Sequence, residues 1–228
     1  MFTTILLIAL GTVPSIIWLT FYLKEDAKHP EPRKLILYTL FAGGLVTVFV
    51  LQLQIIVNDW VTGQGISTYS LVSFVLLGAV EEIFKFLAVY FAVSRRKEFD
   101  EPIDAMVYMV VAALGFATVE NIASIFQSNT FSISSPGPLE TAALRFVGAT
   151  LLHTLTSGVI GYHWGKAIAR GSGRFGGIAF GVVLATLLHA VFNYLIIKSE
   201  PVALPLIFLM FIGLFVLNDF EKLKRVSK

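Results

Sequence analysis

The segment that decides the fold of this chain is Gly78-Ala79-Val80-Glu81-Glu82-Ile83-Phe84-Lys85-Phe86-Leu87. It places three ionisable side chains within five residues, in the middle of a run that otherwise has the length and apolarity of a membrane span. An ionisable side chain at bilayer depth costs roughly 2.5–3.5 kcal/mol on insertion. Because such residues face a bundle interior or a cavity, the segment predicts a functional site buried in a membrane protein.

The composition of the whole chain agrees with a membrane location. Of its 228 residues, 56% are hydrophobic and 14% are charged, and the mean hydropathy is +0.80. Soluble domains are nearer one quarter charged. Basic residues do not cluster beside aromatic ones, so nucleic acid is not an expected partner. The absence of cysteine excludes disulfides and thiolate metal sites. We therefore expect one integral-membrane domain over residues 1–228, embedded in the lipid bilayer.

Apolar runs of about 20 residues, the length that crosses a hydrocarbon core of about 30 Å, recur along the chain. These runs are too long and too uniformly apolar for barrel strands, so helices are the expected spanning element. The sequence thus predicts an all-α, polytopic bundle of about seven transmembrane helices. Their expected ranges are 2–23, 35–57, 68–94, 104–127, 143–166, 175–197 and 201–219.

The basic residues predict how the bundle is oriented. Alternate loops and the C-terminal tail carry 14 of the 17 Lys and Arg residues. Short loops rich in Lys and Arg stay on the cytoplasmic side, so the N-terminus is expected outside and the C-terminus in the cytoplasm. These residues are Lys24, Lys28, Arg33, Lys34, Arg95, Arg96, Lys97, Lys166, Arg170, Arg174, Lys222, Lys224, Arg225 and Lys228.

The charged residues of the third span are spaced to interact with one another. Glu81 and Lys85 are four residues apart and share a helical face, while Glu82 and Lys85 are three apart. Two carboxylates this close cannot both ionise cheaply. A carboxyl group that exchanges its proton near neutral pH suits a general base or acid. The alternative is a structural ion pair between helices.

Later spans add polar side chains at a similar depth. Four separate spans that bring Glu, Glu, His and His to one level predict a shared interior site, because such groups are rare in spans. The added residues are Glu120 and Asn121 on the fourth span, His153 and Ser157 on the fifth, and His189 and Asn193 on the sixth.

Three chemistries use such a set of residues. In hydrolysis a carboxylate activates water, and His and Asn groups stabilise the oxyanion. A zinc site would use imidazole and carboxylate ligands, here Glu81, Glu120, His153 and His189. A proton- or ion-coupled transporter would use the carboxylates and histidines as a relay. The chain lacks paired halves and spans broken at corresponding positions, which argues against transport. A non-catalytic scaffold stays open as well.

Five motifs in order resemble the PrsW family of intramembrane proteases, over roughly residues 10–197. The wider superfamily of CAAX-type and bacteriocin-processing endopeptidases usually has Arg after its paired glutamates and His at the end of the Phe-x-x-x motif. This chain has Lys85 and Glu120 instead. The motifs are Glu81-Glu82-x-x-Lys85, Phe99-Asp100-Glu101-Pro102-x-Asp104-x-x-Val107-Tyr108, Gly115-Phe116-Ala117-Thr118-x-Glu120-Asn121, Arg145 with His153, and Leu188-His189, with Phe21-Tyr22-Leu23-Lys24-Glu25 and Glu31-Pro32 before them.

The resemblance implies an intramembrane endopeptidase of the bacterial inner membrane. Members resemble site-1 proteases that cut a single-pass anti-sigma factor on its extracytoplasmic side, so a single-pass membrane protein is the expected partner. The catalytic helices would lie roughly within residues 68–197. Because the sequence lacks His-Glu-x-x-His, we expect glutamate-type hydrolysis without a cofactor, with zinc as the rival.

The resemblance also implies roles for individual residues. Glu81 would be the base that activates water, and Glu82 would tune or orient the site. Lys85 would hold the pair of glutamates. His189 with Asn193 would form the oxyanion hole. His153 could serve in either task, while Glu120, with Asn121 beside it, would replace a water-holding histidine or orient one.

Overall fold

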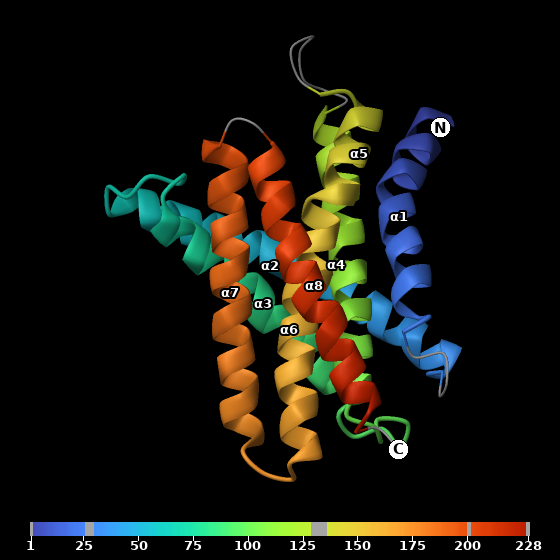
Figure 1. Ribbon diagram of the computed structural model, residues 1–228. Coiled ribbons are helices and arrows are strands. Elements are labelled where there is room, and N and C mark those ends of the chain that lie inside the picture. The colour runs from blue at the N-terminus through green and yellow to red at the C-terminus, as the bar shows by residue number, and fades with distance from the viewer. Residues whose placement is uncertain (1, 26–29, 129–135, 200–201, 227–228) are drawn as a thin grey trace.

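The computed structural model describes residues 2–25, 30–128, 136–199 and 202–226, and its regular elements within these ranges are all helices (Figure 1). This confirms the all-α fold expected from the sequence. The helices are α1 Phe2–Tyr22, α2 Arg33–Gly63, α3 Leu71–Val93, α4 Asp104–Ser128, α5 Pro138–Val147, α6 Ala149–Ala169, α7 Arg174–Lys198 and α8 Ala203–Lys224.

Six stretches among the described residues are long and apolar enough to cross a membrane, and the chain is a multi-pass membrane protein. They correspond to α1, α2, α4, the pair α5–α6, α7 and α8. The remaining predicted span is α3, which is also of spanning length but carries Glu81, Glu82 and Lys85 near its middle. The seven spans expected from the sequence therefore all coincide with helical stretches.

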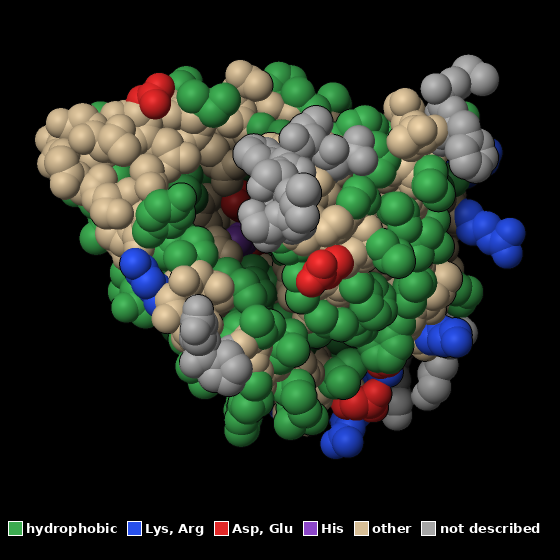
Figure 2. All heavy atoms as spheres, turned by 90° about the horizontal axis from the view of Figure 1, so that it is seen from above, with side chains coloured by type: hydrophobic (Ala, Val, Ile, Leu, Met, Phe, Trp, Pro, Cys, Tyr) green, Lys and Arg blue, Asp and Glu red, His purple; other side chains and the backbone are tan. Residues whose placement is uncertain are grey.

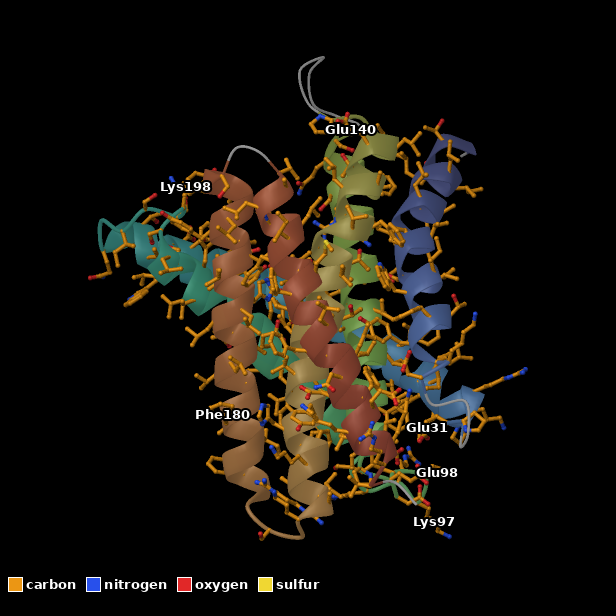
Figure 3. The ribbon with its side chains drawn as sticks, in the orientation of Figure 1. Glu31, Lys97, Glu98, Glu140, Phe180 and Lys198 are labelled. Carbon is orange, nitrogen blue, oxygen red and sulfur yellow. The ribbon has the colours of Figure 1, made fainter. Side chains whose placement is uncertain are left out.

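The helix α4 lies at the centre of the bundle. It packs against α1, α2 and α6, and its residues from Asp104 to Ala117 are all buried. The start of α1 and the end of α8 lie at opposite ends of the bundle, and α1, α3, α6 and α8 all finish at the same end (Figure 1). We call this the basic end, because most Lys and Arg residues belong to the connections there; Lys97 lies at this end, opposite Lys198 (Figure 3).

The helix α2 is longer than a bilayer requires. Its 31 residues correspond to a length of about 46 Å at 1.5 Å per residue. A helix longer than the hydrocarbon core is thick can fit into a bilayer by tilting. Figure 1 shows α2 running across behind the other helices, from beneath α1 toward the beginning of α3. This inclination brings the second half of α2 beside α3, with which it packs.

The fifth predicted span, 143–166, is interrupted where a single helix was expected. The helix α5 ends at Val147, and α6 begins at Ala149, with Gly148 between them at φ −105° and ψ −96°. The Gly148 N–H still donates to the Leu144 carbonyl (2.9 Å), and its carbonyl accepts from the Leu152 N–H (2.9 Å). The two helices therefore continue one another as an interrupted span.

Glycine allows α2 and α4 to pack with their backbones in contact. A Cβ added to Gly115 would lie 1.9 Å from the Leu40 carbonyl oxygen, and one added to Gly43 would lie 2.0 Å from the Ala112 carbonyl oxygen. No flexible side-chain end lies there to move aside. Small residues at helix interfaces permit this close approach in membranes, and the crossing point of α2 and α4 depends on them.

The variant Gly115→Ala is expected to destabilise the protein by at least about 1–3 kcal/mol, the usual cost of overpacking, because the added methyl group meets backbone. The matched control is Gly44→Ala, whose Cβ would lie 3.4 Å from its nearest neighbours. Unfolding of the purified proteins in mixed micelles, followed by circular dichroism, measures the difference. Equal unfolding midpoints for the two variants would contradict the backbone contact.

Candidate active site

Four helices bring six ionisable side chains together inside the bundle. Five of these side chains are buried, and the sixth, that of Glu120, is 17% exposed. Seen from the end opposite the basic end, acidic and histidine atoms are visible at the bottom of a hollow (Figure 2). The residues are Glu81, Glu82 and Lys85 on α3, Glu120 on α4, His153 on α6 and His189 on α7.

Glu82 is held by donors from three helices. Its Oε1 accepts hydrogen bonds from Lys85 Nζ (2.7 Å), Thr156 Oγ1 (3.0 Å) and His189 Nδ1 (2.8 Å). The Glu82 and Lys85 side chains have no exposed surface. Because a buried charge needs a partner and hydrogen bonds, Glu82 ties α3 to α6 and α7, and this oxygen is already occupied by donors.

Glu120 occupies the corresponding place behind His153. Its Oε2 lies 2.8 Å from His153 Nε2 and accepts a hydrogen bond from Arg145 Nη2 at 3.1 Å. Arg145 also donates to Asn121 Oδ1, while Asn121 Nδ2 donates to Thr150 Oγ1 at 3.0 Å. This network connects α4 with α5 and α6 and fixes the position of the Glu120 carboxylate.

Glu81 and Glu82 each have one buried oxygen without a hydrogen-bond partner among the described residues, and that of Glu81 lies beside both histidines. Glu81 Oε1 accepts a hydrogen bond from Gln54 Nε2 on α2, at 2.6 Å. Its Oε2 is buried and has no hydrogen-bond partner among the described residues. That oxygen lies 3.8 Å from His153 Nδ1 and 3.6 Å from His189 Nε2. Glu81 Oε2 therefore faces the two imidazole rings across a short gap.

The partners of the histidines assign their tautomers. His189 donates Nδ1–H to Glu82, and His153 donates Nε2–H to Glu120, since a carboxylate can only accept. On a ring that carries only this one proton, the other nitrogen, His153 Nδ1 or His189 Nε2, is an acceptor that faces Glu81 Oε2. Three acceptor atoms around one point require a cation or a donor. Lys85 Nζ, 3.3 Å from His153 Nδ1, supplies one from the side.

The same three atoms fit a zinc ion. The ligand atoms of Glu81, His153 and His189 lie within 4.8 Å of one another, and two imidazoles with one carboxylate form a known catalytic zinc set that leaves a position for water. Zinc-binding histidines usually donate their other ring N–H to a carboxylate, as His153 and His189 do. Glu120, also a possible ligand from the sequence, lies behind His153.

The other residues predicted for the site lie at its edge. Asn121 belongs to the Arg145–Glu120 network. Asn193, one turn from His189, is half-buried, and its side chain forms no hydrogen bond with a described residue. Ser157 is buried, and its hydroxyl likewise has no hydrogen-bond partner in the described part of the chain.

Two residues that sequence reasoning missed contact the glutamates directly. Gln54 lies in the apolar run of α2, where Gln52 has the same local surroundings but is exposed. Thr156 also donates to backbone carbonyls of its own helix, as many helical threonines do. Gln54 and Thr156 reach the glutamates only because α2 and α6 each pack against α3 at these positions. Such contacts between helices cannot be seen in the local sequence.

Comparison with known proteins assigns the chain to a family. Residues 31–218 match the family described as "PrsW family intramembrane metalloprotease". The chain is 29% identical to Protease PrsW of Geobacillus kaustophilus over 195 residues, 85% of this chain and 81% of the relative. It is 28% identical to Protease PrsW of Clostridioides difficile (96% and 90% covered) and 26% identical to that of Bacillus subtilis (97% of both). No solved structure matches the chain.

The variant Gln54→Leu is expected to lower proteolytic turnover about 10- to 100-fold, the usual effect of losing a group that orients an active-site ligand. The loss follows because Glu81 Oε1 gives up its donor and the carboxylate can rotate away from the histidines. Cleavage by equal amounts of purified protein measures the effect. Gln52→Leu, on the exposed side of the same helix, is the control, and equal turnover in both variants would show that Gln54 does not position Glu81.

Proposed function

The chain belongs to the PrsW family and is a membrane-embedded peptidase, and we propose that it hydrolyses a peptide bond of a single-pass membrane protein at the site around Glu81. The observation that carries this proposal is the meeting of Glu81 Oε2 with the ring nitrogens His153 Nδ1 and His189 Nε2. The hollow in Figure 2 lies at the end of the bundle where a scissile bond could reach these atoms.

In the proposed reaction each residue has a defined task. Glu81 Oε2, which has no hydrogen-bond partner among the described residues and lies beside both imidazoles, can accept a proton from the attacking water and return it to the leaving amine. Gln54 holds the other oxygen of Glu81. The carboxylates of Glu120 and Glu82 keep the two imidazoles in one orientation. Lys85 is the fixed cation beside the reacting atoms.

We further propose that the site takes zinc, although the sequence alone favours hydrolysis without a metal. Neutral histidines present only acceptors to Glu81, and an oxyanion contact through His189 Nε2 would require a second proton on that ring. Glu81, His153 and His189 would hold the ion. When bound, zinc activates water and polarises the scissile carbonyl. Glu81 then serves as a ligand; without zinc it serves as the proton acceptor.

Metal analysis of the purified protein should find about one zinc per chain. His153→Ala and His189→Ala should each lose it, because each removes one of three ligands. His163→Ala is the control, since His163 lies toward the basic end and packs against Phe180. Cobalt substitution gives a readout independent of activity, through its visible absorption. Normal cleavage by wild-type protein that contains no metal would contradict the zinc proposal and favour the metal-free mechanism.

The expected substrate is an anti-sigma factor or a similar single-pass protein of the bacterial cell membrane, as the sequence resemblance implies. The basic end should face the cytoplasm, which would direct the hollow outward. Such an opening favours cleavage near the extracytoplasmic end of the substrate helix.

Cells expressing Glu81→Gln or Glu82→Gln should lack a set of membrane-protein fragments that wild-type cells contain. Glu81→Gln removes the proposed proton acceptor or zinc ligand, and loss of a general base alone lowers rates by roughly 10²–10⁴-fold. Glu82→Gln removes the carboxylate that orients His189. New N-termini in the membrane proteome, compared at equal expression, measure the difference. Identical fragments in all three strains would exclude the glutamate mechanism. If wild-type cells yield none under several envelope stresses, ion flux in liposomes becomes the next assay.

A further inference from the structure

A second cavity lies at the basic end, away from the catalytic atoms. It has a volume of about 570 Å³ and opens between α3 and α7, with α6 as its floor. Glu81, Glu82, Lys85, His153 and His189 do not line it. Two kinds of residue do: aromatic and aliphatic side chains deep in the cavity, and polar ones where α3 ends and α7 begins. We call it the basic-end groove.

The wall of the basic-end groove is built around Trp164. Its ring lies 4.9 Å from that of Phe99 and 5.4 Å from that of Phe86, centroid to centroid. At the rim, Phe91 and Phe175 are 78% and 86% exposed. In a bilayer this exposed aromatic rim would favour contact with lipid over water, and the groove would then be open to an acyl chain from the side.

The mouth of the groove carries positive charge that the protein does not neutralise. Arg95 follows the last turn of α3, and Arg174 is the first residue of α7; both are exposed and both line the groove. Within the described ranges neither forms an ion pair, and no acidic residue lines the groove. The hydroxyl of Ser94 lies at the same level. Guanidinium groups are suited to phosphate oxygens.

We propose that the basic-end groove binds one anionic phospholipid. Its phosphate lies between Arg95 and Arg174, and one acyl chain follows the wall beside Trp164. The positive charge of Arg95 and Arg174 favours a lipid with an acidic head group, because basic pockets between membrane helices at the cytoplasmic side bind such head groups. An apolar substrate helix would leave both arginines without partners, and a free phosphate would leave the aromatic wall uncovered.

The lipid would also act on the helices that carry the site. The groove separates α3, which holds Glu81 and Glu82, from α7, which holds His189. Nearer the catalytic atoms the same helices meet, where a Cβ on Gly78 would lie 3.6 Å from His189 Cβ. An acyl chain in the groove would therefore support α3 and α7 on the side where they diverge.

Fluorescence quenching by brominated lipid tests the proposal. The full-length protein is placed in phosphatidylcholine vesicles containing increasing amounts of phosphatidylglycerol with brominated acyl chains. The signal of Trp164 is obtained by difference from Trp164→Phe. Saturable quenching at a small mole fraction is expected. In Arg95→Gln/Arg174→Gln the half-saturating fraction should rise about 30-fold, since each juxtamembrane arginine contributes roughly fivefold.

The control removes the same charge from the same end of the bundle. Arg33 and Lys34 are exposed at the start of α2, and Arg33→Gln/Lys34→Gln should bind as the wild type does. Ile178→Phe, which narrows the groove without changing charge or adding a tryptophan, should weaken the site. Equal quenching by brominated phosphatidylcholine, equal loss in the control, displacement by glycerol phosphate alone, or displacement by a transmembrane peptide of the substrate would each overturn the proposal.

Discussion

The burial of an ion pair within the membrane constrains the rest of this structure. Glu82 and Lys85 have no exposed surface, and unpaired charges in such surroundings would cost several kcal/mol each. A single helix cannot satisfy both groups. Thr156 from α6 and His189 from α7 donate to Glu82 Oε1, and His153 lies beside Lys85. The helices α3, α6 and α7 must therefore meet at this depth.

The same ion pair is continued by contacts to both imidazole rings. Lys85 lies between Glu82 and His153 and contacts both. Glu120 contacts His153 and is itself held by Arg145. Each histidine thus has a carboxylate behind it, one from α3 and one from α4, and these partners fix the imidazoles.

The sequence predicted the helices and the depth of the charged residues, because both depend on local patterns. Apolar runs set the spans, and the spacing of Glu81 and Lys85 sets a shared helical face. What could not be predicted depends on contacts between helices. Gln54 and Gln52 differ only in which side of α2 meets α3. The interruption at Gly148 leaves the run of apolar residues unbroken and so cannot be seen in the sequence. The ring nitrogens that face Glu81 follow from partners on two other helices, α3 and α4.

The backbone contact between α2 and α4 lies at a fixed distance along α2 from the Gln54–Glu81 hydrogen bond. Gly43 lies at that contact, and Gln54 is eleven residues further along α2, which is about 16 Å at 1.5 Å per residue. At this radius a rotation of one degree about the contact moves Gln54 by about 0.3 Å, so about three degrees would break a hydrogen bond of ordinary length. The close contact at Gly43 therefore limits how far α2 can turn before the hydrogen bond between Gln54 and Glu81 is lost.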